Sequence, residues 1–199
     1  MTTNVRKEVE RKEVTITGFG GQGIVLAGKI MASAAALEDR KESTLVQSYG
    51  PEARGGACSA QVIISDRPIH YPQVRHSDIL VCMSQAGFDK FIGQLKKDGT
   101  LLVDQDLVHP QGLERDYFAI PSTRMAEELG RKMMANIIML GFFAAVTGAV
   151  SVEAARNTVA RSVPKGTEEQ NLKAFAKGCD YGFAVLKGRQ KKAEGKTGA

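Results

Sequence analysis

The fold is decided by residues 14–32, which read VTITGFGGQGIVLAGKIMA. The first four residues are β-branched, as is typical of a buried strand, and the glycines that follow end this strand in a tight turn. From Ile24 onward the apolar residues recur at intervals of three and four, which predicts a helix. A strand, a glycine turn and a helix in this order open a βαβ unit.

Strand and helix patterns alternate along the first 120 residues. The later strands are predicted at 44–46, 59–65, 78–83, 100–103 and 117–120, with a helical stripe at 88–95. Beyond residue 123 every apolar pattern is helical, and the last helix is predicted at 168–186. We therefore predict an α/β fold, namely a single doubly wound, Rossmann-like, mostly parallel sheet with a helical C-terminal third. The domain is expected to span residues 14–187, between an N-terminal extension (1–13) and a basic flexible tail (188–199).

The charge and hydropathy of the chain exclude two classes of partner. Of its formal net charge of +5, most comes from residues 187–199, which hold five basic side chains and one acidic side chain. No basic stripe with interleaved aromatic residues appears, so we expect no nucleic-acid binding. The longest apolar run, 137–150, is shorter than the roughly 20 residues of a membrane span, and residues 1–13 lack the apolar core of a signal peptide. We therefore expect no contact with a membrane.

The cysteines limit the redox chemistry of this chain. Cys58, Cys82 and Cys179 are the three cysteines, and no pair has CxxC spacing. The three histidines share no ligand spacing either, so we predict no metal site and no iron–sulfur cluster held by this chain alone. A sparse, odd set of cysteines fits the reducing cytoplasm. Cys58 has no histidine or lysine motif beside it, and we interpret it as a buried strand residue rather than a nucleophile.

The glycine turn matches the pattern GxGxxG through Gly18, Gly20 and Gly23. Glycines let the backbone approach an anion, and the N-terminus of the following helix offers free N–H groups and a partial positive charge. The alternative is that these glycines only allow the helix to pack closely on the strand. An adenine dinucleotide is disfavoured, because the second strand ends in residues 46–48, Val-Gln-Ser, without the acidic residue that would bind a ribose.

A second informative stretch is the polar loop 48–56, which reads SYGPEARGG. Arg54 carries a fixed cation with a bidentate fork, and Gly55 and Gly56 offer unshielded backbone N–H groups beside it. This combination suits a phosphate or a carboxylate. The alternative is a surface turn closed by an ion pair between Arg54 and Glu52.

Together the two loops resemble a known family. GFGGQGIVLAG at 18–28 and SYGPEARGG at 48–56 closely resemble the γ subunit of 2-oxoacid:ferredoxin oxidoreductases. The resemblance covers roughly residues 13–187, and its further segments lie at 62–66, 78–83, 126–130, 135–136, 139–141 and 171–175. The second loop, with the Tyr-Pro pair at 71–72, looks most like the 2-oxoglutarate branch.

The resemblance implies a subunit of an enzyme complex, with no catalytic residue of its own. In this family a 2-oxoacid is decarboxylated on thiamine diphosphate, electrons pass through iron–sulfur clusters to ferredoxin, and the acyl group is transferred to coenzyme A. Thiamine diphosphate and the clusters belong to the partner subunits α, β and, where present, δ. The γ chain is expected to pack on these subunits in the cytoplasm, with coenzyme A held near it and no cofactor bound tightly by this chain alone.

For the site itself we expect the two loops to act together. Gly18, Gly20, Gly21, Gln22 and Gly23 would line an anion-binding edge, with the Gln22 amide at its tip. A phosphate of coenzyme A would be taken by the cation and the two glycines of the second loop, which are Arg54, Gly55 and Gly56. The alternatives are that both loops dock the α subunit, that the chain is a purely structural subunit, or that it is a free-standing nucleotide-binding protein.

Overall fold

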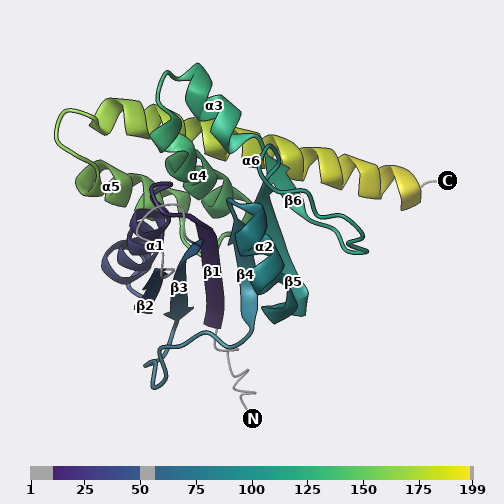
Figure 1. The fold of residues 1–199 in the computed structure, drawn as a ribbon, viewed down its shortest axis with the longest axis horizontal. Coiled ribbons are helices and arrows are strands. Elements are labelled where there is room, and N and C mark those ends of the chain that lie inside the picture. The colour runs from purple at the N-terminus through teal and green to yellow at the C-terminus, as the bar shows by residue number, and fades with distance from the viewer. Residues whose placement is uncertain (1–10, 50–56, 198–199) are drawn as a thin grey trace, which may run out of the picture.

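The computed structural model describes residues 11–49 and 57–197, and within them six strands form one sheet (Figure 1). The strand order is β2-β3-β1-β4-β5-β6. The strands are β1 (Arg11–Phe19), β2 (Glu42–Tyr49), β3 (Ala57–Ser65), β4 (Ser77–Cys82), β5 (Leu95–Asp104) and β6 (Phe118–Ile120). The helices are α1 (Ile24–Ser33), α2 (Gln85–Phe91), α3 (Ser122–Glu128), α4 (Ala135–Thr147), α5 (Val152–Ser162) and α6 (Glu168–Thr197). Three short helical turns complete the list, η1 (Ala34–Glu38), η2 (Ile92–Gln94) and η3 (Lys132–Met134).

The sheet is mostly parallel, as predicted, but one strand is inserted against that direction. β1, β4, β5 and β6 pair in parallel, whereas β3 pairs antiparallel with both β1 and β2. β1 and β2 therefore run the same way and are joined by α1, but β3 lies between them. The strand, turn and helix predicted for residues 14–32 are confirmed. The two strands that the helix joins, however, are not neighbours in the sheet.

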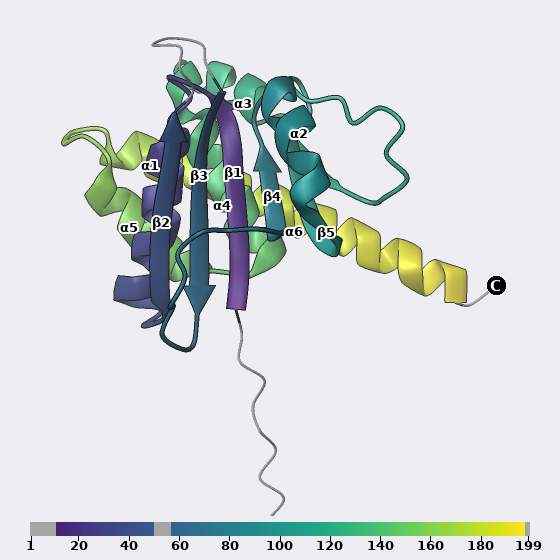
Figure 2. The ribbon, with the colours of Figure 1, turned by 60° about the horizontal axis from the view of Figure 1, so that its bottom comes forward.

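Helices cover both faces of the sheet, which confirms the doubly wound prediction. Figure 2 shows α2 in front of the sheet and α1, α4, α5 and α6 behind it. The apolar side chains of β1 and β3, such as Val14 and Val62, join the larger core with these four helices. Leu80 and Leu101 of β4 and β5 point the other way and pack with Phe88 of α2. Two apolar layers thus enclose the sheet, as is usual for parallel strands.

Most of the apolar run 137–150 lies in α4, which ends at Thr147 and is buried over its first ten residues. α4 crosses α6 at a distance that only glycine permits. A Cβ at Gly178 would lie 1.9 Å from the Ile138 carbonyl oxygen, and one at Gly141 would lie 2.1 Å from the Phe175 carbonyl oxygen. The two helix backbones are therefore in direct contact. Among the described residues, no helix is long and apolar enough to cross a membrane.

Three predicted boundaries are corrected by the structure. Leu95, assigned to a helical stripe, begins strand β5 instead. β1 begins at Arg11, inside the predicted extension 1–13, of which residues 1–10 lie outside the described part. The predicted flexible tail 188–199 is helical as far as Thr197, since α6 continues through it.

The extension of α6 has a physical cause in its composition and in one anchor. Lysine, arginine, glutamine, alanine and glutamate are good helix formers, and these residues dominate the segment. Arg189 donates a hydrogen bond of 2.5 Å to the Tyr117 carbonyl and stacks its guanidinium 3.8 Å from the centre of the Phe118 ring. Past this anchor at the β6 edge, the end of α6 projects from the body (Figure 1).

The glycine contact between α4 and α6 is testable by one added methyl group. Gly178→Ala is expected to lower the free energy of unfolding by about 1–3 kcal/mol, because its Cβ would overlap the Ile138 carbonyl and force the helices apart. Gly188→Ala on the same helix is the control. No atom lies within 4 Å of a Cβ there, so it should be neutral or stabilising, by up to about 1 kcal/mol. Urea unfolding of both variants compares them, and equal stabilities would contradict the close-contact interpretation.

Candidate functional site

The glycine turn between β1 and α1 lies at the carboxyl edge of the sheet. Gly21 and Gly23 have φ angles of 98° and 73°, in the left-handed region that side chains disfavour. The turn is closed by the Gln22 N–H, which donates to the Phe19 carbonyl at 3.1 Å. Gly23 caps α1 without a side-chain hydrogen bond, and the first turn of α1 holds no acidic residue. The N-terminus of α1 thus keeps its partial positive charge.

Gln22 joins the glycine turn to the end of β4. Its Oε1 accepts a hydrogen bond from the Phe19 N–H at 2.6 Å, and its Nε2 donates to the Met83 carbonyl at 2.9 Å. β1 and β4 are the neighbours whose following helices, α1 and α2, go to opposite faces of the sheet. Open α/β sheets bind ligands at such a point, in the crevice beyond the strand ends. In this chain the Gln22 amide occupies that crevice, and its polar atoms bond to the chain's own backbone.

The predicted glycines differ in what surrounds them. A Cβ at Gly18 would lie 2.4 Å from Gln22 Oε1 and 2.6 Å from Ile24 Cδ1, so Gly18 serves the packing of the turn on the strand. Gly20 and Gly21 are exposed, and a Cβ at Gly21 would meet no atom within 4 Å. The exposed part of the turn, where a ligand has access, is therefore Gly20–Gly21.

The second predicted group, Arg54, Gly55 and Gly56, lies outside the described residues, but both ends of its loop are described. The register pairs Phe19 with Ala57, at the start of β3. Cys58 pairs with Gly18 on one side and with Tyr49, the last residue of β2, on the other. The strand ends that flank the two sequence motifs are therefore adjacent.

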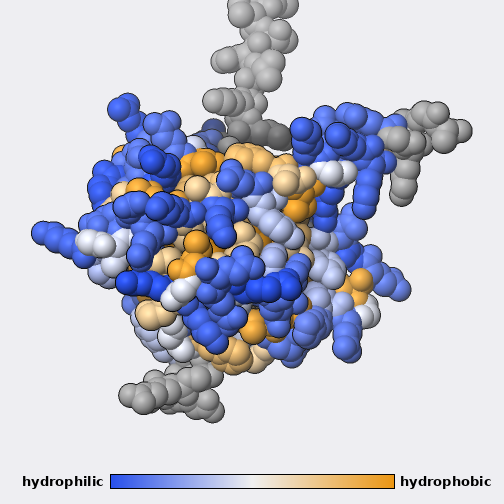
Figure 3. Space-filling model, turned by 90° about the horizontal axis from the view of Figure 1, so that it is seen from above, coloured by the Kyte–Doolittle hydropathy of each residue, from blue (hydrophilic) through white to orange (hydrophobic). Residues whose placement is uncertain are grey.

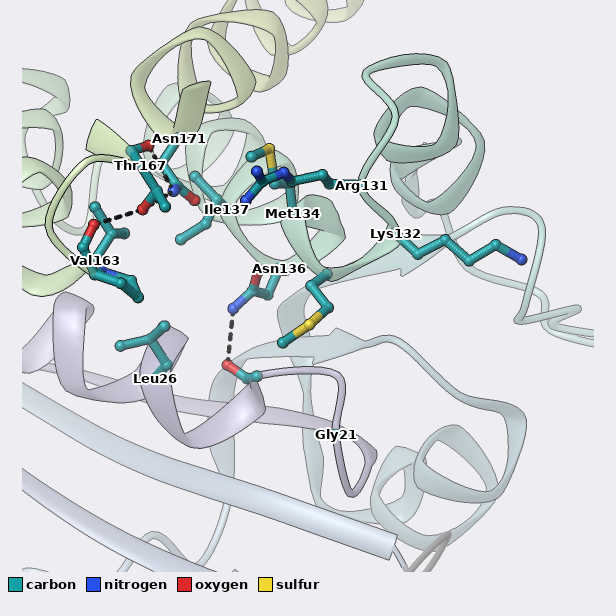
Figure 4. Close-up of a pocket in the computed structure, with 13 residues that line it drawn as sticks. Gly21, Leu26, Arg131, Lys132, Met134, Asn136, Ile137, Val163, Thr167 and Asn171 are labelled. Atoms are coloured by element: carbon teal, nitrogen blue, oxygen red, sulfur yellow. Dashed lines mark hydrogen bonds between the residues drawn. The ribbon is translucent and has the colours of Figure 1, made fainter. Parts of the chain in front are cut away.

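A cavity of about 500 Å³ lies beside the glycine turn (Figure 4). It is bounded by the start of α1, the segment before α4 with its first turn, and the connection from α5 to α6. Its lining residues are Gly21, Gly23, Leu26, Arg131, Lys132, Met133, Met134, Asn136, Ile137, Val163, Pro164, Thr167 and Asn171. Seen from the α3 end, the molecule exposes apolar surface between polar side chains (Figure 3).

Asn136 is the residue of this cavity that holds the glycine turn. Its Nδ2 donates to the Gly23 carbonyl at 3.0 Å, a contact between residues 113 positions apart (Figure 4). A Cβ at Gly23 would lie 2.2 Å from Nδ2, so this approach also requires glycine. The sequence prediction of the site missed Asn136. In the sequence, Asn136 is marked only by being a single amide at the start of the most apolar helix.

The cysteines have no place in the site as nucleophiles. Cys58, Cys82 and Cys179 are free thiols, and all three are buried. Burial raises the pKa of the Cys58 and Cys82 thiols and brings the pKa of Cys179 to about 11, so all three are protonated at neutral pH. Within the described residues, no group of three or more histidine, cysteine or acidic side chains is placed to hold a metal ion.

The bridging role of Gln22 predicts a local effect of its removal. Gln22→Leu should destabilise the fold by about 1–3 kcal/mol, since the Phe19 N–H and the Met83 carbonyl lose their partners. Hydrogen exchange at the Phe19 amide should accelerate more than exchange in α5. Gln170→Leu, at an exposed position of α6, is the matched control and should leave both quantities unchanged. An unaltered Phe19 exchange rate in Gln22→Leu would contradict the bridge.

Comparison with known proteins gives the family. The family model for pyruvate ferredoxin/flavodoxin oxidoreductase matches residues 13–181. The 2-oxoglutarate synthase subunit KorC of Methanocaldococcus jannaschii is 50% identical over 179 residues, which are 88% of this chain and 96% of the relative. The γ subunit of a keto/oxoacid ferredoxin oxidoreductase from Geobacter sulfurreducens has a TM-score of 0.79 and 42% identity, covering 88% of this chain and 98% of its own.

The fold also occurs inside a longer chain. The 2-oxoglutarate:ferredoxin oxidoreductase of Magnetococcus marinus, solved with 2-oxoglutarate, coenzyme A and succinyl-CoA bound, matches with a TM-score of 0.76 at 22% identity. The match covers 88% of this chain and 31% of that one, so there the fold is one part of a larger polypeptide. The matching family model, the KorC relative and the solved γ subunit agree with the resemblance found in the two loops. The chain belongs to the pyruvate ferredoxin/flavodoxin oxidoreductase family and is a subunit of its γ type.

Proposed function

We propose that this γ subunit serves an oxidoreductase complex whose substrate is 2-oxoglutarate, which is oxidatively decarboxylated to its acyl-CoA with reduction of ferredoxin. The observation that carries the proposal is the match to the 2-oxoglutarate synthase subunit, 50% identical across 96% of that subunit. Related subunits named for ketoisovalerate and pyruvate are 34% and 35% identical to this chain. The difference in identity favours the 2-oxoglutarate branch.

The cysteines support a separation of roles among the subunits of the complex. A cluster bound by four cysteines needs more thiolates than the three in this chain, and these lie buried on β3, β4 and α6. We infer that the iron–sulfur clusters and thiamine diphosphate are held by α, β and δ subunits, and that ferredoxin receives its electrons from them. Free, buried thiols also fit a reducing cytoplasm as the location of the complex.

The part we assign to this chain is to position coenzyme A. Gly20 and Gly21 are exposed at the N-terminus of α1, which has no acidic residue in its first turn. The loop that holds Arg54, Gly55 and Gly56 begins and ends beside this turn, as the pairs Tyr49–Cys58 and Phe19–Ala57 require. The sequence of the loop supplies an arginine fork and glycine N–H groups, which together with the exposed N–H groups of the turn suit the phosphates of coenzyme A. Gln22 contributes by fixing the turn through Phe19 and Met83.

The competing proposal is that both loops dock the α subunit. Its support is the same adjacency of the strand ends, because a polar loop that contains an arginine also suits a subunit contact. The two proposals differ in what Arg54 contributes. A ligand contact affects the affinity for coenzyme A, whereas a docking contact affects the assembly of the complex.

Arg54→Ala in the intact complex separates these proposals. We expect the KM for coenzyme A to rise about 10- to 100-fold with the subunits still assembled, because a charge-assisted hydrogen bond to phosphate contributes roughly 1.5–3 kcal/mol. Arg156→Ala, at an exposed position of α5, is the control and should leave the KM unchanged. An unchanged KM in an assembled Arg54→Ala complex would refute the phosphate contact, and loss of the γ chain would support docking.

The proposal that the substrate is 2-oxoglutarate is tested by a separate measurement. The complex purified with its partner subunits should show a kcat/KM for 2-oxoglutarate at least tenfold above those for pyruvate and 2-oxoisovalerate. The reason is that a site built to pair a second carboxylate leaves buried polar groups unpaired with the smaller or apolar substrates. Reduction of ferredoxin followed by absorbance gives these rates. A higher kcat/KM for pyruvate would place the chain in another branch.

A further inference from the structure

The cavity beside the glycine turn has the dimensions and the lining of a small-molecule site. Its volume of about 500 Å³ lies within the range of roughly 300–1,000 Å³ that is usual for such sites. Its walls are mainly apolar, with Leu26 from α1 opposite Met134 and Ile137 at the start of α4 (Figure 4). Sites of this kind carry a few polar groups that fix the orientation of the ligand.

One such polar group is buried in the cavity wall without a partner. The side-chain oxygen of Asn136 has no hydrogen-bond partner among the described residues, and the residue is only 2% exposed. Its orientation is fixed, because Nδ2 must face the Gly23 carbonyl, to which it donates. The opposite atom of the amide, Oδ1, is therefore an acceptor. A buried acceptor without a donor costs free energy that a ligand carrying an N–H or O–H group would recover.

The mouth of the cavity favours negative charge. Arg131 extends over it toward α6 (Figure 4), and within the described part of the chain no ion pair engages its guanidinium. Lys132 points away and pairs with Glu127 at 2.9 Å, which raises the pKa of the lysine and leaves Arg131 as the available cation. On the opposite side the cavity is lined by Gly21, which has open space beside it and lies close to the N-terminus of α1. The N–H groups and the dipole of a helix N-terminus attract anions.

From these three features we propose that the cavity binds the adenine and phosphate of an adenine nucleotide. The planar, weakly polar base fits between the leucine, methionine and isoleucine walls, and methionine sulfur packs well on aromatic rings. The exocyclic amino group donates to Asn136 Oδ1, and the phosphate lies between Arg131 and the glycine turn. A base with a hydrogen atom in place of that amino group leaves Oδ1 unpaired.

The nucleotide comes from one of two sources, a free adenine nucleotide or the adenine end of coenzyme A. In the second case the inference rests on the proposed function and extends it, because the glycine turn borders the cavity. Both sources share the same base contact with Asn136. They differ in whether AMP competes with coenzyme A.

The test is a comparison of two ligands on the full-length chain by calorimetry. AMP should bind about tenfold tighter than purine riboside 5′-monophosphate, which lacks only the amino group. Asn136→Leu should bind the two ligands within twofold of each other, because the acceptor is gone. Equal binding of both ligands to the unaltered chain, or binding of neither, would overturn the inference.

A second pair of variants does not depend on the Asn136 hydrogen bond to the turn. Leu26→Trp fills the cavity from a half-buried position of α1 and should abolish AMP binding. Lys29→Trp, one exposed turn along the same helix, should bind AMP as the unaltered chain does. AMP binding that survives Leu26→Trp would place the nucleotide elsewhere.

Kinetics of the intact complex distinguish a free adenine nucleotide from the adenine end of coenzyme A. They also separate the cavity inference from the proposed function. Competition of AMP with coenzyme A, together with a raised coenzyme A KM in Asn136→Leu, identifies the cavity as the adenine end of that site. AMP binding without competition identifies a free nucleotide, which leaves the cavity assignment standing. If Arg54→Ala raises the coenzyme A KM while the chain binds no AMP, the proposed function stands and this inference fails.

Discussion

The approach of α4 to its neighbours is the constraint on which the rest of the structure depends. Gly141 and Gly178 let α4 and α6 touch backbone to backbone, so each helix position depends on the other. The first turn of α4 then places the Asn136 amide against the Gly23 carbonyl at 3.0 Å. Because cores are close-packed, a shift at the helix crossing is transmitted to the glycine turn rather than absorbed. The conformation of the turn thus depends on a residue more than 100 positions away as well as on its own hydrogen bonds.

The glycine turn also shows how one sequence pattern serves two purposes. Gly18 and Gly23 are required for packing, the first by Gln22 and Ile24 and the second by Asn136. With the Gln22 amide bonded across the ends of β1 and β4, the crevice between these strands is filled from within. Only the outer part of the turn remains for a ligand. The same pattern in a dinucleotide-binding fold leaves that crevice for the pyrophosphate, so GxGxxG alone does not determine the ligand.

The features that can be predicted from the sequence are those encoded locally. The strand and helix at residues 14–32, the β-branched strands and the buried helix α4 were predictable, because each pattern depends on neighbours in sequence. The insertion of β3 was not, since the order of strands is decided by which edges meet in three dimensions. The helical extension of α6 was missed because its charge and glycines suggested a solvated end, whereas Arg189 finds its partners on β6. The role of Asn136 could not be predicted, since a single amide in an apolar helix carries no pattern.

The inserted strand also brings the two ends of the second loop, Tyr49 and Ala57, to the sheet edge that holds the glycine turn. If the chain had left β2 for a second crossover helix, the residues after Tyr49 would have departed from the sheet edge. Because β3 instead returns between β2 and β1, Ala57 must lie beside Phe19 at the edge of the glycine turn. Both ends of the second loop are thereby held at the same edge as the turn, and the antiparallel pairing fixes the register. The feature that departs most from a regular parallel sheet is therefore the one that places these loop ends beside the glycine turn.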